Sequence, residues 1–93
     1  MKKLLVTGLN GFVGRHLQAL LEGASSSWKL LESPARDLLE PASLDVWLQD
    51  DCPDAVIHLA GQTFVPEAFR DPAQTIKVNL LGTMNLLQAL KRR

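Results

Sequence analysis

The chain has 93 residues and a formal net charge of zero. Its length allows one domain or part of one, and no basic stripe interleaved with aromatic residues points to nucleic acid binding. The single Cys52 excludes an internal disulfide and a cysteine metal motif, which favours a reduced, cytoplasmic setting, and no stretch approaches the roughly 20 apolar residues of a membrane span.

The first predicted elements are a strand and a helix joined by glycines. Residues 3–7 form an apolar run that stops at Gly8, which predicts a short buried strand. The next apolar residues recur at helical spacing and would share one face of a helix that starts near Phe12 and ends near Gly23: Val13, Leu17, Leu20, Leu21 and Ala24. Residues 28–32 are the second predicted strand, and residues 36–39 are a very short third one.

The second half of the chain alternates in the same way. Pro41 suits the first turn of a helix whose apolar side consists of Leu44, Trp47 and Leu48. The stretch "DAVIHLA", residues 54–60, is the clearest strand, with a proline before it and a glycine after it. Asp71-Pro72 then provides an N-cap and a first-turn residue for a long helix through Leu90.

The order of elements predicts the fold class. Strands and helices alternate as β-α-β-(β)-α-β-α, which is typical of an α/β fold with a parallel sheet and helices on both of its faces. The long helix is apolar over more than one stripe, so it is expected to have neighbours on several sides. Gly82 costs about 1 kcal/mol in the middle of that helix, which indicates a closely packed neighbour there.

Three glycines stand between the first strand and the first helix. In "VTGLNGFVG", Gly8 permits a tight turn, Gly11 lets a pyrophosphate approach the backbone, and Gly14 lets the helix lie close to the strand. The helix N-terminus adds unpaired N–H groups and a partial positive charge. The spacing is G-x-x-G-x-x-G rather than G-x-G-x-x-G, but its context favours a dinucleotide site; a purely structural turn is the alternative.

The choice between NAD and NADP stays open. A carboxylate about 20 residues past such a loop binds the ribose 2′-hydroxyl of NAD, and Glu32 follows Gly14 by eighteen residues. Arg36 follows closely and would suit the additional phosphate of NADP. For each of the two side chains, a plain solvated charge is an equally good interpretation.

The stretch "VTGLNGFVGRHL" resembles the extended short-chain dehydrogenase/reductase superfamily. Residues 53–90, "PDAVIHLAGQTFVPEAFRDPAQTIKVNLLGTMNLLQAL", are similar to the GDP-4-keto-6-deoxy-D-mannose reductases within it. The resemblance covers the whole chain and implies a Rossmann-type fold. It also implies reduction of a 4-keto-6-deoxy sugar nucleotide, such as GDP-4-keto-6-deoxy-D-mannose, with NAD(P)H.

The resemblance further implies roles for particular positions. The pyrophosphate would be held by the glycine loop, that is, by Gly8, Asn10, Gly11, Phe12, Val13 and Gly14. Asp37 and Leu38 match a pair that contacts the adenine, and Leu59, Ala60 and Gly61 would lie beside the nicotinamide ribose. The sugar substrate would lie against Gln62, Thr63, Phe64 and Val65, with Asn79 near the active site.

Several of these residues also have structural interpretations. His58 alternates with apolar residues in a buried strand, so it is expected to be a satisfied core residue and no catalyst. Asp37 could cap the turn before Pro41, and Asn79 could be a packing or capping group in its helix. Phe64 could simply cover the core.

The catalytic residues of the superfamily are missing from this chain. Its chemistry depends on a Tyr-x-x-x-Lys pair, in which the tyrosine is the general acid and the lysine lowers its pKa, and the chain contains no tyrosine. We therefore expect residues 1–93 to be the N-terminal part of a cofactor-binding domain, without the rest of the sheet and the substrate domain, and to be inactive alone. A non-catalytic dinucleotide-binding module, and an epimerase or dehydratase of the same superfamily, are the alternatives.

The same reasoning predicts the partners. The expected ligand is a nucleotide sugar, with no nucleic acid and no membrane, and the enzyme is expected to be a homo-oligomer. Residues 55–60 should present an unpaired strand edge, and the long helix should leave apolar side chains bare. The 93-residue chain is therefore expected to self-associate.

Overall fold

The computed structural model describes residues 2–23, 27–31 and 38–92. The chain divides into two compact units: a sheet unit of residues 1–35 and 51–60, and a helical unit of residues 36–50 and 61–93. Glu32, Arg36 and Asp37 lie outside the described residues.

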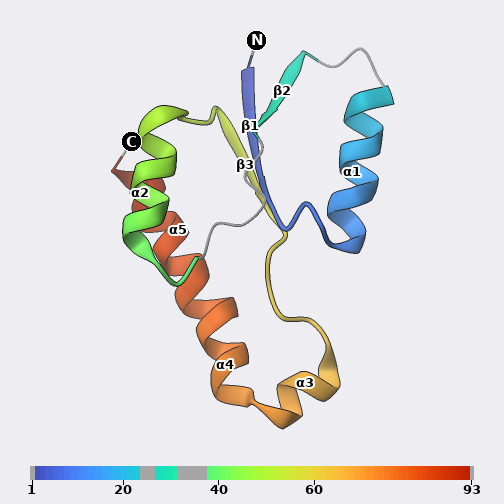
Figure 1. Ribbon diagram of the computed structural model, residues 1–93, viewed down its shortest axis with the longest axis vertical. Coiled ribbons are helices and arrows are strands. Elements are labelled where there is room, and N and C mark those ends of the chain that lie inside the picture. Colours follow the sequence, from blue (N-terminus) through green and yellow to red (C-terminus); the bar gives the residue numbers. More distant parts are fainter. Residues whose placement is uncertain (1, 24–26, 32–37, 93) are drawn as a thin grey trace. The chain divides into compact units, whose positions relative to one another are not determined.

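Three parallel strands form the sheet of the sheet unit, in the order β2-β1-β3 (Figure 1). The central strand β1 (Lys2–Thr7) pairs with β2 (Trp28–Leu31) on one edge and with β3 (Ala55–His58) on the other. The central position explains why residues 4–6 of β1 are all apolar and buried, because a central parallel strand is covered on both faces. The predicted α/β fold with a parallel sheet is confirmed.

Helix α1 (Phe12–Gly23) packs on this sheet through Leu17 and Leu21. Both side chains lie against a buried cluster of Leu4, Val6 and Leu9. The prediction that Val13 and Leu20 share this buried face is wrong, since their side chains are 57% and 67% exposed. At about 100° per residue, Leu20 points to the side of Leu17 away from Leu21, and Val13 lies in the first turn of the helix, before the residues that reach the core.

Strand β3 is an edge strand among the described residues. It pairs with β1 alone, so its second edge has no strand partner within the described ranges, as predicted. The strand is shorter than the predicted 54–60, because its last register pair with β1 is Thr7 with His58. The Leu59 N–H still donates to the Thr7 carbonyl, and the Leu59 and Ala60 N–H groups both donate to the Thr7 hydroxyl.

Two helices lie side by side in the helical unit, α2 (Pro41–Asp50) and α5 (Gly82–Lys91) (Figure 1). Arg92 follows α5 and donates from Nε and Nη2 to Oδ1 of Asp45, at 3.1 and 2.7 Å. The predicted apolar side of α2 is buried, as are two residues of α5: Leu44, Trp47, Leu48, Leu86 and Ala89.

The segment before α2 corrects one prediction and confirms another. Leu38 and Leu39 form a turn, so the predicted strand 36–39 is wrong in its described half. The Leu38 carbonyl accepts from Nδ2 of Asn85 at 2.8 Å, which gives it a side-chain partner in place of a strand. A Cβ added at Gly82 would lie 3.2 Å from Cβ of Leu38, so the close neighbour predicted at this glycine is present.

The long predicted helix consists of three helical segments. They are α4 (Pro72–Ile76), the π-helical η1 (Lys77–Leu81) and α5. At the end of η1 the Gly82 N–H donates to the Lys77 carbonyl five residues earlier, where an α-helix would use the fourth. The prediction of one regular helix from Asp71 to Leu90 is therefore wrong for its middle part.

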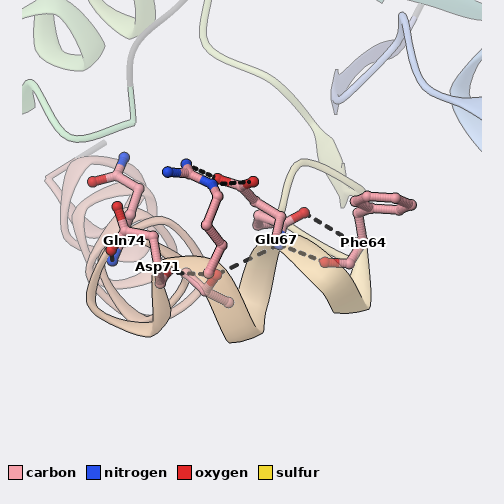
Figure 2. A network of polar contacts seen from close by, with 7 residues as sticks. Phe64, Glu67, Asp71 and Gln74 are labelled. Atoms are coloured by element: carbon pink, nitrogen blue, oxygen red, sulfur yellow. Dashed lines mark hydrogen bonds and ion pairs between the residues drawn. The ribbon is translucent and has the colours of Figure 1, made fainter.

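A short helix that the sequence did not indicate, α3 (Val65–Arg70), precedes these segments. Figure 2 shows how it passes into α4: the Asp71 N–H donates to the Glu67 carbonyl at 2.9 Å, while Oδ1 of Asp71 accepts from the Gln74 N–H at 3.1 Å. Asp71 thus ends one helix and caps the next, which confirms the predicted N-cap. Glu67 also forms an ion pair with Arg70.

Candidate functional site

Gly8 lies at the end of β1 in a conformation that favours glycine. Its φ is +78°, in the left-handed region. A Cβ there would lie 2.8 Å from N of Ala60 and 2.9 Å from C of Leu59. The turn after β1 therefore touches the segment after β3, and no side chain fits between them.

Gly14 is buried in the first turn of α1. A Cβ added there would lie 2.2 Å from the carbonyl oxygen of Gly8 and 2.6 Å from Cα of Leu9. The start of the helix thus lies directly against the glycine turn. This close packing is the role that the sequence assigns to the third glycine.

Gly11 differs from the other two glycines. It is exposed, and its added Cβ would have one neighbour, the Gly8 carbonyl oxygen at 3.4 Å, which is ordinary van der Waals contact. Its N–H donates to that same oxygen at 3.1 Å. The protein's own packing therefore requires glycine at 8 and 14 but leaves space at 11.

The N-terminus of α1 faces the same turn. Its first backbone bond of the i→i−4 type runs from the Arg15 N–H to the Gly11 carbonyl at 3.0 Å. The amides of Phe12, Val13 and Gly14 come before it, and such amides have no partner within a helix. Together with the helix dipole they can bind an anion.

Thr7 connects the glycine turn to β3, a role that sequence reasoning missed. Its buried hydroxyl accepts from the N–H groups of Leu59 and Ala60, each at 3.1 Å, and lies 2.6 Å from Nδ1 of His58. Because the hydroxyl oxygen accepts from two N–H groups, its own proton is available to Nδ1, an arrangement that fits a neutral His58 with its proton on Nε2. All three partners lie more than 50 residues away in the sequence, beyond the reach of any local signal.

His58 is a hydrogen-bonded, partly buried residue of β3, as predicted for a satisfied histidine. Burial lowers its pKa below the ordinary value of 6.5, because the low-dielectric surroundings disfavour the imidazolium. The neutral ring is therefore the form that fits its contact with Thr7.

The segment after Ala60 is held by Asn79 in the helical unit. Oδ1 of Asn79 accepts from the Gln62 N–H at 2.6 Å, and Nδ2 donates to the Gln62 carbonyl at 2.9 Å. A Cβ at Gly61 would lie 3.1 Å from the same Oδ1, so this glycine leaves space for the amide. Asn79 is thus a polar partner of the loop, in agreement with its structural interpretation.

Gln62 forms a second pair of the same kind. Its Oε1 accepts from the Phe64 N–H at 2.8 Å, and its Nε2 donates to the Phe64 carbonyl at 2.9 Å and lies 3.5 Å from Oγ1 of Thr75. The ring of Phe64 is 67% exposed, so it does not cover a core within the described residues. Thr63 and Val65 are exposed as well.

The predicted site residues fall into two groups. In the sheet unit the glycine turn lies beside Leu59 and Ala60. In the helical unit Gly61 and Gln62 lie against Asn79, and Leu38 lies against Gly82. Arg36 and Asp37 are outside the described residues, so their predicted contacts stay predictions.

A metal site would need a cluster of ligating side chains, and a membrane span would need a long apolar helix. In the described part of the chain, no group of three or more histidine, cysteine, aspartate or glutamate side chains is arranged to hold a metal ion. None of the helices described is both long enough and apolar enough to cross a membrane.

Known proteins are similar in sequence to this chain over nearly its whole length. The chain is 67% identical to the GDP-6-deoxy-D-mannose reductase of Pseudomonas aeruginosa, over 99% of this chain and 30% of that protein. It is 37% identical to the GDP-6-deoxy-D-talose 4-dehydrogenase of Aggregatibacter actinomycetemcomitans, over 95% of this chain and 30% of that protein. The chain thus spans about a third of the length of these relatives.

Solved structures share the fold. The structure of RMD from Pseudomonas aeruginosa complexed with NADPH matches with a TM-score of 0.89 and 66% identity, over 100% of this chain and 31% of that one. The Thermus thermophilus UDP-glucose 4-epimerase complex with NAD matches with a TM-score of 0.83 and 28% identity, over 97% and 34%. A family profile matches residues 4–93. The chain belongs to the NAD dependent epimerase/dehydratase family.

Proposed function

We propose that residues 1–93 are the N-terminal, cofactor-binding part of a cytoplasmic oxidoreductase that reduces a 4-keto-6-deoxy sugar nucleotide, of the GDP-4-keto-6-deoxy-D-mannose type, with NAD(P)H. One observation carries the proposal: Gly11 is a glycine that the protein's own packing does not require, at an exposed helix N-terminus. A ligand that approaches the backbone there explains it. The reductase name of the 67% identical relative and the NADPH in the RMD structure support the choice of reaction and cofactor.

The pyrophosphate would bind at the glycine turn. The N–H groups of Phe12 and Val13 are on exposed residues in the first turn of α1, and Asn10 and Gly11 are exposed directly before that turn. The Gly11 N–H already donates to the Gly8 carbonyl, so Gly11 would contribute space for the ligand. Gly8 and Gly14 contribute by shape, because their missing side chains let β1, the segment after β3 and α1 meet. A diphosphate at this point would gain both the amide donors and the helix dipole.

The other contacts are proposed from the resemblance. Asp37 and Leu38 would contact the adenine, and Leu59, Ala60 and Gly61 the nicotinamide ribose. Arg36 would instead meet the additional phosphate if the cofactor is NADP. The Thr7 hydroxyl supports the ribose contacts, since it fixes the backbone of Leu59 and Ala60. The loop of Gln62, Thr63, Phe64 and Val65 would lie beside the sugar.

When bound, the nicotinamide supplies a hydride to the 4-keto carbon. The carbonyl oxygen must then gain a proton, and in this superfamily a tyrosine with a lowered pKa supplies it. No tyrosine is present in residues 1–93. We therefore propose that these residues bind and orient the cofactor, and that the proton donor lies in a part of the enzyme outside them.

Cofactor titration of the full-length protein tests the proposal. Gly11→Val places a branched side chain where the diphosphate would lie, and NADPH and NADH affinity should fall by at least roughly tenfold. Gly23→Val is the matched control, because an added Cβ at Gly23 has nothing within 4 Å. Circular dichroism checks that both variants fold. Equal cofactor affinity in Gly11→Val and the wild type would contradict the proposal.

A second candidate reaction has its own support. The UDP-glucose 4-epimerase structure with NAD shares the fold at 28% identity, and a dTDP-glucose 4,6-dehydratase of Neisseria meningitidis is 31% identical. An epimerase or dehydratase returns its cofactor unchanged after each cycle, whereas a reductase consumes one reduced cofactor per product. The two reaction types can be separated by mixing the enzyme with known amounts of NADPH and GDP-4-keto-6-deoxy-D-mannose and following NADPH absorbance. A reductase should consume one NADPH for each sugar nucleotide reduced. A full-length protein that binds the cofactor but converts no nucleotide sugar would fit a non-catalytic module.

A further inference from the structure

The side chain of Gln62 has little capacity left for a ligand. Nε2 donates to the Phe64 carbonyl and lies within reach of Oγ1 of Thr75, and Oε1 already accepts from the Phe64 N–H. An amide has two donors and two acceptor positions, so one acceptor position remains. Gln62 is thus occupied almost entirely by the loop to which it belongs.

The two amides act in series. Asn79 pairs with both backbone groups of Gln62, and Gln62 pairs with both backbone groups of Phe64. A side-chain amide that does this takes the place of a neighbouring strand. The π-helical segment η1, which contains Asn79, is therefore connected to Phe64 through two pairs of hydrogen bonds.

Thr63 is the residue that these pairs leave out. It is exposed, and in the described part of the chain neither its backbone nor its hydroxyl takes part in a hydrogen bond. The neighbouring ring of Phe64 is largely exposed. One polar residue and one aromatic ring are thus presented to solvent by a backbone held on either side.

We propose that Gln62 is a positioning residue: its amide fixes the Phe64 backbone so that Thr63 and the Phe64 ring meet the nucleotide-sugar ligand. The inference rests on the proposed function for the identity of that ligand. It differs from a direct contact through Gln62, which the resemblance alone would suggest. An ionised glutamate at this position could accept from the Phe64 N–H but could not donate to the Phe64 carbonyl.

Hydrogen exchange of the Phe64 amide tests this in the full-length protein without any ligand. Gln62→Ala removes the acceptor, so the amide should exchange roughly three- to tenfold faster. Gln88→Ala, at an exposed position of α5, is the control and should leave the rate unchanged. Unchanged Phe64 exchange in Gln62→Ala would overturn the inference.

A conservative variant gives a second readout. Gln62→Glu keeps the acceptor for the Phe64 N–H, but at pH 8 its carboxylate faces the Phe64 carbonyl without a proton to donate, so the Phe64 protection factor should lie between those of Gln62→Ala and the wild type. The protection factor should rise as the pH falls towards about 4, where the carboxyl gains that proton. The wild-type protection factor should not change over this range. A direct contact between Gln62 and the ligand predicts no such recovery in the ligand-free protein. Absence of the recovery would therefore count against the positioning role.

Binding of the sugar nucleotide connects the loop to function. In the same proteins Gln62→Ala should weaken binding of GDP-mannose, a stable analogue of the substrate class, by about three- to tenfold, and Gln88→Ala should not. A faster Phe64 exchange with unchanged binding would overturn the ligand part of the inference. A wild-type protein that binds neither NADPH nor GDP-mannose would overturn the proposed function. The exchange of the Phe64 amide tests the role of Gln62 independently of that outcome.

Discussion

The hydroxyl oxygen of Thr7 lies 2.6 Å from Nδ1 of His58, and these two residues are the last register partners of β1 and β3. The same hydroxyl accepts from the two N–H groups directly after β3. One side chain therefore ends the parallel pairing and fixes the segment against which Gly8 rests.

Replacing this hydroxyl should destabilise the protein. Thr7→Val keeps the shape but leaves the Ala60 N–H and Nδ1 of His58 without their partner, and the free energy of unfolding should fall by about 1–3 kcal/mol. Urea denaturation of the full-length protein measures the change. Thr7→Ser retains the hydroxyl and should stay close to the wild type; a Val variant as stable as the Ser variant would show that the contacts contribute little.

His58 should make stability depend on pH. Its pKa is lowered in the folded state by burial, so the unfolded chain binds more protons below about pH 6.5. Its contribution to the free energy of unfolding is therefore present above that pH and is lost as the pH falls towards the folded-state pKa. Denaturation between pH 7.5 and pH 5.5 should show a smaller decline in His58→Asn, whose Oδ1 can still accept from Thr7. An identical decline in both proteins would assign the pH dependence to other groups.

Gly14 and Gly11 should respond differently to replacement by alanine. Gly14→Ala places a Cβ 2.2 Å from the Gly8 carbonyl oxygen and should cost at least about 1–3 kcal/mol of stability. Gly11→Ala has ordinary contact distances, so its stability should stay within about 0.5 kcal/mol of the wild type while its cofactor affinity falls. Thermal unfolding and NADPH titration separate the two effects. A Gly11→Ala protein that unfolds as readily as Gly14→Ala would show that the middle glycine is structural.

Cofactor choice should depend on Arg36. If its guanidinium binds the additional phosphate of NADP, Arg36→Ala should weaken NADPH binding by about tenfold or more. NADH lacks that phosphate and is the internal control, so its affinity should not change. Isothermal titration of both cofactors decides, and an equal NADPH affinity in the variant would remove Arg36 from the site.

The 93-residue chain produced alone should self-associate and show no reductase turnover. The second edge of β3 has no strand partner among the described residues, and an open edge pairs readily with other chains. Ile57 is exposed on that strand, so Ile57→Lys should shift the sedimentation profile towards monomer. A monomeric wild-type fragment at high concentration would contradict the association, and turnover of a 4-keto sugar nucleotide would contradict the expected inactivity.

Local signals predicted most of the fold and the shape of the glycine turn. Glycine spacing and a change of hydrophobic period place the turn between Thr7 and Phe12, because each acts within a few residues. Helix α3 was missed because six residues are too few to show a period, although Pro66 in its first turn is the same start signal that Pro41 and Pro72 give. The roles of Thr7 and Asn79 depend on partners that are distant in sequence, which no periodicity records.

The π-helical segment has a consequence for how the C-terminal helix is used. A turn closed five residues back contains roughly one residue more than an α-helical turn, which rotates the residues before it by about 100° relative to the residues after it. Asn79 can thereby face the Gln62 backbone while Leu86 and Ala89 are buried further along the same continuous backbone. The additional residue thus lets one continuous backbone meet both requirements, the Asn79 contact and the buried face of α5. Deleting one residue from 77–81 would preserve only one of the two.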